Sequence, residues 1–154
     1  MPSKRPVTIL MADDDPDDRK LTLDAFAEAK LNNDLRFVED GVELLNYMHR
    51  RGKFSDPASS PRPGIILLDL NMPRKDGREA LQELKSDPRF KSIRVIIMTT
   101  SKAEQDIIRS YNLSAASYIT KPVTFEALVD VVKTLGKYWL EIVELADNGD
   151  NSNS

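Results

Sequence analysis

Short apolar segments that end in acidic or hydroxyl-bearing residues recur along the chain. Three of them, residues 7–12, 64–69 and 95–99, are apolar at nearly every position. Residues 35–38 and 116–120 are weaker segments of the same kind. A strand that is apolar on both faces is typical of a parallel sheet that helices cover on each side. The pattern therefore predicts five strands, of which the three strongly apolar ones suit a buried position.

Amphipathic segments lie between these predicted strands. Asp15 and Pro16 mark one helix start, because an aspartate caps free backbone N–H groups and proline fits the first helical position. The expected buried faces of the helices are formed by Leu21, Ala25, Phe26 and Ala29, by Val42, Leu45 and Met48, by Ala80, Leu81 and Leu84, and by Ile107, Ile108 and Tyr111. A last helix is expected to begin near Thr124. Strands and helices that alternate in this way predict a doubly wound α/β fold.

The composition narrows the chemistry that the chain can perform. Its 154 residues include 22 basic and 25 acidic residues, no cysteine and a single histidine, His49. Disulfides and thiolate metal sites are therefore excluded, and a Ser-His-Asp triad has little support. The apolar runs are too short to span a membrane, and no basic stripe favours nucleic acid. We expect a cytoplasmic protein that binds neither membrane nor nucleic acid, with His49 solvated on an exposed helix.

One domain is expected over residues 6–146. Residues 52–63 are rich in proline and serine and are expected to form the longest loop. The polar residues 147–154 have nothing to bury and are expected to be disordered.

Polar residues follow four of the predicted strands. Asp13, Asp14 and Asp15 follow the first strand, Asp69 ends the third, residues 99–101 end the fourth, and Lys121 follows the fifth. Ligands of a doubly wound sheet bind at this edge, outside the carboxyl ends of the strands. Taken singly, each residue could be a helix-start acid, a turn residue or an ordinary strand residue. Together they indicate a site with oxygen ligands and one ammonium group, which suits Mg²⁺ and a phosphoryl group.

Four motifs carry a resemblance to a known family. ILMADDDP, IILLDLNMPRKDG, VIIMTTS and SYITKP resemble the receiver domain of two-component response regulators, over roughly residues 6–139. The 30 residues from Asp69 to Thr99 and the 52 from Asp69 to Lys121 match the spacings of that family. The resemblance implies a flavodoxin-like (βα)5 receiver fold, with a five-stranded parallel sheet in the order 2-1-3-4-5.

The resemblance also implies a role for each site residue. Asp69 is expected to accept a phosphoryl group from a sensor histidine kinase, so the protein signals and is not an enzyme with an external substrate. Mg²⁺, with Mn²⁺ as a substitute, is expected to be bound by Asp13, Asp14, Asp69 and the backbone carbonyl of Asn71. The expected residues that stabilise the phosphoryl group or switch the structure are Thr99, Lys121 and Tyr118. The expected modulators are Asp15, Ser101 and Pro122, with a cis Lys121–Pro122 peptide bond as in similar proteins.

The apolar stripe of the last helix continues past the usual end of a receiver domain. Its candidate dimer residues are Phe125, Leu128, Val132, Leu135, Trp139, Ile142 and Val143. The first four could equally pack on the sheet of their own domain, and Gly136 could bend the extension back onto it. We expect a homodimer through the fourth helix, the fifth strand and the fifth helix.

The finer resemblance is to single-domain response regulators that serve bacterial and cyanobacterial phytochromes. It is carried by LLDLNMPRKDGREAL, by the Thr-Thr-Ser sequence at residues 99–101, by the insertion at residues 52–63 and by YWLE at residues 138–141. It implies a phytochrome-type kinase as the partner.

Three alternatives remain beside this interpretation. A phosphatase of the haloacid-dehalogenase type also uses an aspartate nucleophile, but it needs a second aspartate where this chain has Asn71. A flavodoxin-like cofactor binder would need a phosphate-binding loop after the first strand, and none is evident. Within the receiver interpretation, the protein could also carry phosphate onward or act as a phosphate sink.

Overall fold

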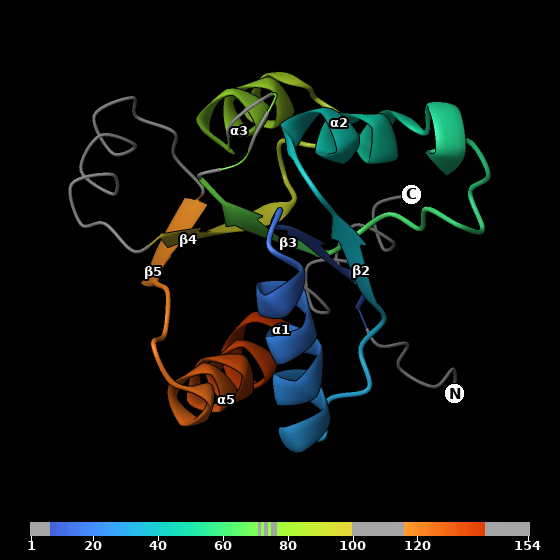
Figure 1. The fold of residues 1–154 in the computed structure, drawn as a ribbon. Coiled ribbons are helices and arrows are strands. Elements are labelled where there is room, and N and C mark those ends of the chain that lie inside the picture. Colours follow the sequence, from blue (N-terminus) through green and yellow to red (C-terminus); the bar gives the residue numbers. More distant parts are fainter. Residues whose placement is uncertain (1–6, 71, 73, 75–76, 100–115, 141–154) are drawn as a thin grey trace.

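The fold is built on one parallel sheet. A computed structural model describes residues 7–70, 72, 74, 77–99 and 116–140 (Figure 1). The strands are β1 (Ile9–Ala12), β2 (Leu35–Val38), β3 (Ile65–Asp69), β4 (Arg94–Thr99) and β5 (Ala116–Thr120). They are parallel throughout, and their order in the sheet is β2-β1-β3-β4-β5. The expected strands and their order are confirmed.

Helices connect these strands. They are α1 (Pro16–Glu28), α2 (Gly41–His49), α3 (Gly77–Ser86) and α5 (Phe125–Thr134), with a short 3-10 turn at Gly52–Phe54. A π-helical segment, Leu135–Leu140, continues α5 without a break. The helix expected to bury Ile107, Ile108 and Tyr111 lies outside the described residues. No helix in the described part of the chain is long and apolar enough to cross a bilayer.

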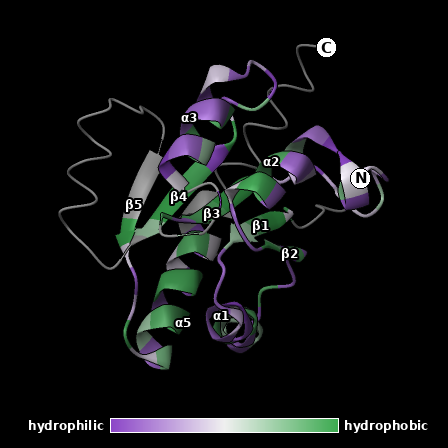
Figure 2. Ribbon diagram, turned by 45° about the horizontal axis from the view of Figure 1, so that its top comes forward, coloured by the Kyte–Doolittle hydropathy of each residue, from purple (hydrophilic) through white to green (hydrophobic). Residues whose placement is uncertain are grey.

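Successive residues of the central strands pack into two separate hydrophobic clusters. Ile9 and Met11 of β1 pack with residues of α1 and α5, whereas Leu10 and Ala12 pack with residues of α2 and α3. Figure 1 shows α1 and α5 on one side of the sheet and α2 and α3 on the other. Every residue of β1 and β3 is buried, and Figure 2 shows the hydrophobic strands between helices, of which α1 and α3 are largely hydrophilic and α5 is largely hydrophobic. Burial of each large apolar side chain contributes about 1.5–3 kcal/mol to folding.

Helix caps form where the sequence predicts them. The Asp15 carboxylate accepts a hydrogen bond from the Asp17 amide at 2.9 Å, and Thr124 accepts one from the Ala127 amide at 3.1 Å. The prediction for Leu21 is wrong, because its side chain is 44% exposed. Thr22 takes the buried position, and its hydroxyl donates to the Asp18 carbonyl at 2.8 Å, which satisfies the polar atom.

The last helix buries part of the apolar stripe in its own domain. Val132 and Leu135 are 1% and 3% exposed and pack into the cluster that α1 and the sheet share. Their assignment to a dimer surface is therefore corrected, because the spacing that would form an intermolecular stripe also faces the sheet. Gly136 lies against Leu31, whose methyl groups would be 3.0 Å from an added Cβ.

The expected loop at residues 52–63 is more ordered than its composition indicates. It begins with the 3-10 turn, and Ser60 is only 1% exposed. The Ser60 hydroxyl donates to the Phe54 carbonyl at 2.7 Å, and the Tyr47 hydroxyl donates to the Pro61 carbonyl at 2.7 Å. The first bond closes the segment on itself, and the second fixes it to α2.

Gly77 brings the start of α3 against the end of β3. A Cβ at this position would lie 2.6 Å from the Asp69 carbonyl oxygen and 2.8 Å from the Leu70 Cα. The Gly77 amide also donates to the Leu70 carbonyl at 3.0 Å. Both obstacles are backbone atoms, so only glycine allows this approach.

We expect Gly77→Ala to lower the free energy of unfolding by about 1–3 kcal/mol, because backbone atoms must move to accept the methyl group. Urea denaturation would measure the change. Gly136→Ala is the matched control, since its Cβ meets only the rotatable Leu31 side chain. Equal stability of Gly77→Ala and the unaltered protein would contradict this close approach.

Candidate functional site

The sheet register places two buried carboxylates side by side. Ala12 of β1 pairs with Leu68 of β3. The residues that follow them, Asp13 and Asp69, therefore lie together at the carboxyl edge of the sheet. Their exposures are 0% and 8%. Asp14 is exposed, yet its carboxylate, with those of Asp13 and Asp69, contributes to a group of oxygens that all lie within 4.8 Å of one another.

This carboxylate group suits a divalent cation. Hard cations such as Mg²⁺ and Mn²⁺ prefer carboxylate, carbonyl and water oxygens. Asp13, Asp14 and Asp69 supply three carboxylates without any competing soft ligand, and the side chains converge from two neighbouring strand ends. The residues present therefore fit the expected metal. Asn71, the fourth expected ligand, lies outside the described residues.

Lys121 brings a positive charge to the same edge. Its ammonium group donates to the carboxylates of Asp18 at 2.9 Å, Asp69 at 3.0 Å and Asp13 at 3.4 Å. The Lys121 side chain is 19% exposed. Asp18 was not predicted as a site residue. Its position three residues after the helix cap Asp15 was the only indication in the sequence. An acidic residue there is equally well explained by its favourable interaction with the helix dipole.

The pKa values of Asp13 and Lys121 are both raised, for different reasons. Burial raises the pKa of the Asp13 carboxyl to about 6, although the Asp15 amide and the Lys121 charge act to lower it. Burial also acts to lower the pKa of Lys121, but its hydrogen bonds to Asp18 and Asp69 outweigh that effect and raise it. Lys121 therefore stays charged at neutral pH.

Backbone and side-chain donors fix the orientation of Asp13. The Asp13 carboxylate accepts a bond from the Asp15 amide at 2.9 Å, and Arg19 donates to the Asp13 carbonyl at 2.7 Å. The Asp13 amide donates to the Val38 carbonyl at 3.0 Å. These contacts hold the end of β1 while leaving the second oxygen of Asp13 directed toward Lys121.

An ion pair ties the segment after β3 to α2. Arg74 has a left-handed backbone with φ of 64°, and its Nε donates to the Asp40 carboxylate at 2.7 Å. Asp40 is 5% exposed and also caps α2 by accepting from the Glu43 amide at 2.8 Å. Burial acts to raise the pKa of Asp40, but the bonds from Arg74 and the helix amides hold it below its ordinary value.

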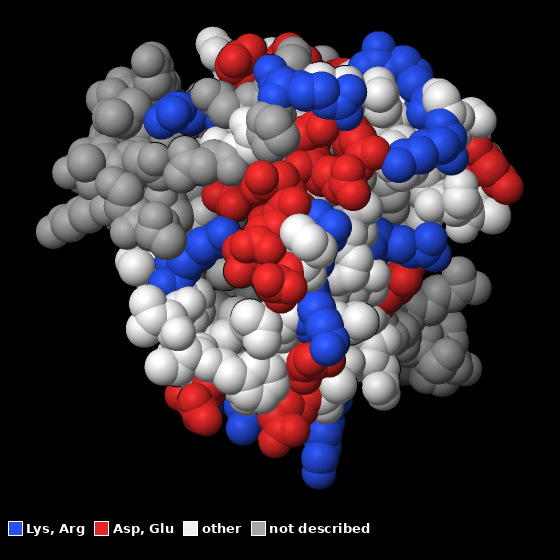
Figure 3. All heavy atoms as spheres, in the orientation of Figure 1, with Lys and Arg blue, Asp and Glu red and all other residues white. Residues whose placement is uncertain are grey.

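A small hollow opens beside Lys121. It is lined by Met11, Asp13, Asp18, Leu21, Thr22, Met98, Lys121, Pro122, Val123, Thr124, Phe125 and Leu128. The large apolar residues at its rim are exposed: Leu21 by 44%, Val123 by 96% and Phe125 by 37%. Acidic side chains gather at the centre of the face seen in Figure 3. The edge is thus acidic in the middle and apolar beside Lys121.

The remaining predicted residues are only partly placed. Thr99 ends β4, and Tyr118 lies in β5 opposite Ile97, but only their backbone is described. Ser101 lies outside the described residues. Asp15 caps α1, so its carboxylate faces the helix start.

The expected cis bond before Pro122 is wrong. Within the described residues no peptide bond is cis, so Lys121–Pro122 is trans. The trans form is the ordinary preference even before proline. Lys121 reaches Asp69 from this trans geometry.

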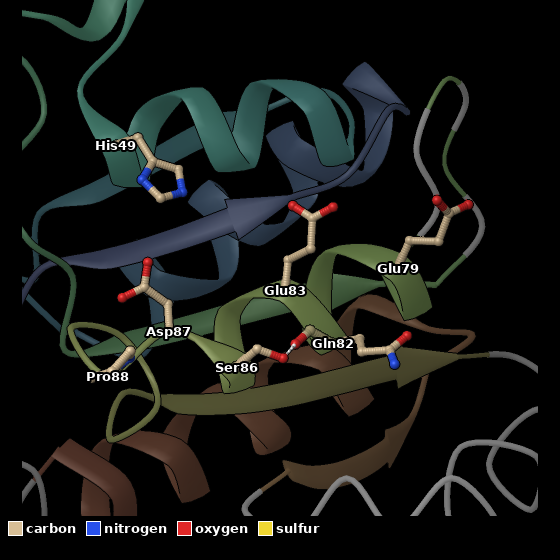
Figure 4. Close-up of a pocket in the computed structure, with 7 residues that line it drawn as sticks. All are labelled: His49, Glu79, Gln82, Glu83, Ser86, Asp87 and Pro88. Atoms are coloured by element: carbon tan, nitrogen blue, oxygen red, sulfur yellow. Dashed lines mark hydrogen bonds between the residues drawn. The ribbon is translucent and has the colours of Figure 1, made fainter.

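His49 is not the solvated residue that its helix pattern predicts. Its ring packs edge-on against Phe90, with centroids 5.3 Å apart, and its Nδ1 lies 3.0 Å from the Arg89 guanidinium. Burial, followed by the charges of Arg51 and Arg89, lowers its pKa. Figure 4 shows His49 on α2, facing a second hollow between α2 and α3. As the last residue of α2, His49 lies at the helix end remote from the carboxyl edge.

Comparison with known proteins agrees with this geometry. The response regulator receiver domain model matches residues 9–133. Response regulator Rcp1 of Synechocystis is 37% identical over 143 residues, which span 93% of this chain and 95% of Rcp1.

Solved structures show the same similarity. The phosphorylated cyanobacterial phytochrome response regulator RcpA is 39% identical, with a TM-score of 0.77 over 88% of this chain and 95% of that chain. Response regulator RPA3017, from red light signalling of R. palustris, is 36% identical, with a TM-score of 0.80 over 88% of this chain and 94% of that chain. The Mn²⁺-bound form of Rcp1 is 37% identical, with a TM-score of 0.76 over 88% of this chain and 96% of that chain. With its sheet order, its acidic edge and a family match over most of its length, this chain belongs to the response regulator receiver domain family.

Proposed function

We propose that Asp69 accepts a phosphoryl group from a phosphohistidine of a sensor histidine kinase. The observation that carries this proposal is the Asp69 carboxylate itself, which lies 3.0 Å from the Lys121 ammonium and within the carboxylate group of Asp13 and Asp14. An anionic nucleophile that attacks an anionic phosphoryl group needs positive charge beside it, and this edge of the sheet supplies it.

The proposed step conserves atoms and charge. A lone pair of an Asp69 oxygen forms the new P–O bond, while the P–N bond of phosphohistidine breaks and its electron pair stays on the imidazole nitrogen. Lys121 lies 3.0 Å from an Asp69 oxygen, where its charge would offset that of the incoming phosphoryl oxygens. The product is an acyl phosphate that carries close to two negative charges where the Asp69 carboxylate carried one, so the buried edge gains about one negative charge.

The proposed metal is Mg²⁺, held by Asp13, Asp14, Asp69 and the carbonyl of Asn71, with Mn²⁺ as a substitute. When bound, it would offset the repulsion between the carboxylates and the phosphoryl oxygens. The Mn²⁺-bound form of Rcp1 supports a divalent ion in this family.

The proposed switch responds to the new phosphoryl oxygens. Thr99 would donate its hydroxyl to them, and Tyr118 would turn as the end of β4 moves. Asp15, Ser101 and Pro122 would modulate the lifetime of the phosphoryl group. The paired strand ends at Thr99 and Thr120 support a shared movement of β4 and β5.

The proposed donor is a phytochrome-type histidine kinase in the cytoplasm. The names of RcpA and RPA3017, which connect those proteins with phytochrome or red light, support this partner. Its phosphohistidine must reach Asp69, so its surface must cover the hollow beside Lys121. The exposed Leu21 and Val123 border that hollow and offer apolar contact area. In this proposal the protein acts as a phosphoacceptor and does not turn over an external substrate.

We further propose a homodimer through β5, α5 and the expected fourth helix, which lies outside the described residues. Phe125 is 37% exposed and Leu128 is half-buried, so both remain candidates for this surface. The side chain of Trp139 and the whole of Ile142 and Val143 lie outside the described residues.

We expect Asp69→Asn to abolish labelling by radiolabelled acetyl phosphate or by a phosphorylated histidine kinase, because the amide is not a nucleophile. Phosphoprotein gels run without heating or alkaline treatment, which would hydrolyse an acyl phosphate, give the measurement. Asp24→Asn, on the exposed side of α1, is the control and should be labelled normally. Retained label in Asp69→Asn would overturn the assignment of Asp69.

The phytochrome partner needs a separate test, in which the rates of phosphoryl transfer from different kinases are compared.

We expect protons to compete with Mg²⁺ at Asp13. Because the Asp13 carboxyl has a pKa of about 6, it is protonated below that pH and must lose the proton to bind the metal. Mg²⁺ affinity should therefore be level above about pH 7 and fall by up to about tenfold per pH unit below about pH 6. Isothermal titration calorimetry would measure it. Asp13→Asn should bind more weakly and lose this inflection, and an affinity independent of pH would contradict the prediction.

We expect sedimentation of the protein at tens of micromolar to show dimers, with Phe125→Ser shifting the population toward monomers. Glu126→Ser, on an adjacent exposed position, is the control. A monomer at these concentrations, with and without phosphorylation, would refute the dimer.

A further inference from the structure

Three carboxylates from three elements surround the Lys121 ammonium group. Asp13 follows β1, Asp69 ends β3, and Asp18 lies in the first turn of α1. The shortest of the three contacts is the 2.9 Å bond to Asp18. An ammonium group has three N–H donors, so these acceptors match its full donor capacity.

Asp18 differs from the other two partners of Lys121. Asp13 and Asp69 belong to the carboxylate group that fits a metal ion, whereas Asp18 does not belong to it. Phosphorylation of Asp69 and metal binding would engage the oxygens of Asp69 and Asp13. Asp18 is then the carboxylate that can keep its bond to Lys121 throughout.

A lysine needs such an anchor to act at a fixed point. Its ammonium group sits on a flexible four-carbon stem, and holding it in one place costs side-chain entropy. Asp18 has a short side chain on the first turn of α1, which Asp15 caps and where Thr22 bonds to the Asp18 carbonyl. The Asp18 side chain is 36% exposed and lines the same hollow as Lys121.

We propose that Asp18 is a positioning residue whose carboxylate holds the Lys121 ammonium beside Asp69. The inference rests on the proposed function of Asp69, and it assigns Asp18 an effect on phosphoryl transfer that is exerted through Lys121. The incoming phosphoryl oxygens then meet a cation whose place is already set, which reduces the reorganisation needed in the transition state.

A merely structural role makes a different prediction. An acidic residue in the first turn of a helix stabilises the helix dipole, whatever its contacts. Asp17 precedes Asp18 in the same turn and is exposed, and no ion pair of its side chain is found in the described part of the chain. Asp17→Ala is therefore a matched control that removes the same charge from the same helix start.

A double-mutant cycle on the full chain tests the inference. The variants are Asp18→Ala, Lys121→Ala, the double variant and Asp17→Ala, each labelled with acetyl phosphate at saturating Mg²⁺. We expect Asp18→Ala to lower the rate at saturating acetyl phosphate by about tenfold, the effect of one charge-assisted hydrogen bond. The half-saturating donor concentration should change little. In the Lys121→Ala background, Asp18→Ala should have no further effect, and Asp18→Glu should restore part of the rate.

A second measurement needs no phosphoryl transfer. Exchange of the Lys121 ammonium protons with water, followed by nuclear magnetic resonance, should become faster in Asp18→Ala and stay unchanged in Asp17→Ala. Thermal melting confirms that each variant is folded, and Asp18→Asn replaces Asp18→Ala if the latter unfolds.

The outcomes separate this inference from the proposed function. An equal loss of rate in both Lys121 backgrounds, the same loss in Asp17→Ala, or unchanged proton exchange in Asp18→Ala would overturn the positioning role while Asp69 labelling stands. An unlabelled wild-type chain, or a labelled Asp69→Asn variant, would instead overturn the proposed function of Asp69. In that case the proton-exchange result alone decides whether Asp18 holds Lys121.

Discussion

The ion pairs of Lys121 are the interaction on which the carboxyl edge of this sheet depends. Parallel pairing of β1 with β3 forces Asp13 and Asp69 together in a place that excludes most water. Their carboxylate oxygens lie within 4.8 Å of each other, so the two charges repel. Ionisation of each buried group without a positively charged partner is also unfavourable. The ammonium group of Lys121 offsets part of that cost and bridges to α1 through Asp18.

The rest of the fold holds this unfavourable edge in place. Hydrophobic clusters pack on both faces of the strands. The backbone of Asp69 is in close contact with Gly77 at the start of α3. Arg74 accepts a left-handed backbone conformation that is uncommon for its residue type, and the bond to buried Asp40 compensates for it. Buried charge is therefore concentrated at the carboxyl edge, and the two hydrophobic clusters supply the packing that holds it.

The sequence predicts what depends on backbone periodicity. Strand ends at Asp13, Asp69 and Lys121 follow from apolar runs and parallel topology, so these three residues could be brought to one edge before any coordinates were known. Asp18 could not be placed in this way, because its role depends on how far the Lys121 side chain reaches across to α1. Its helix-start position has a sufficient local explanation that hides the longer contact.

Two further differences have the same cause. His49 lies on a helix whose local pattern indicates exposure, but Arg89 and Phe90, from the turn after α3, pack against it. Val132 and Leu135 have a spacing that suits a dimer stripe and a domain core equally well, and only the placement of α5 on the sheet distinguishes the two. Each case depends on tertiary approach, which the spacing of residues along one element does not encode.

Side chains along β1 and β3 alternate between the two faces of the sheet. They therefore contribute to two separate hydrophobic interiors, with the backbone of the sheet between them. A substitution that changes the volume of a side chain in the cluster of α1 and α5 affects residues that do not belong to the cluster of α2 and α3. Because substitutions without shared partners combine additively, the two interiors can diverge independently over evolutionary time. The polar edge draws residues from strands that border both interiors, so it is the constraint that the two faces share.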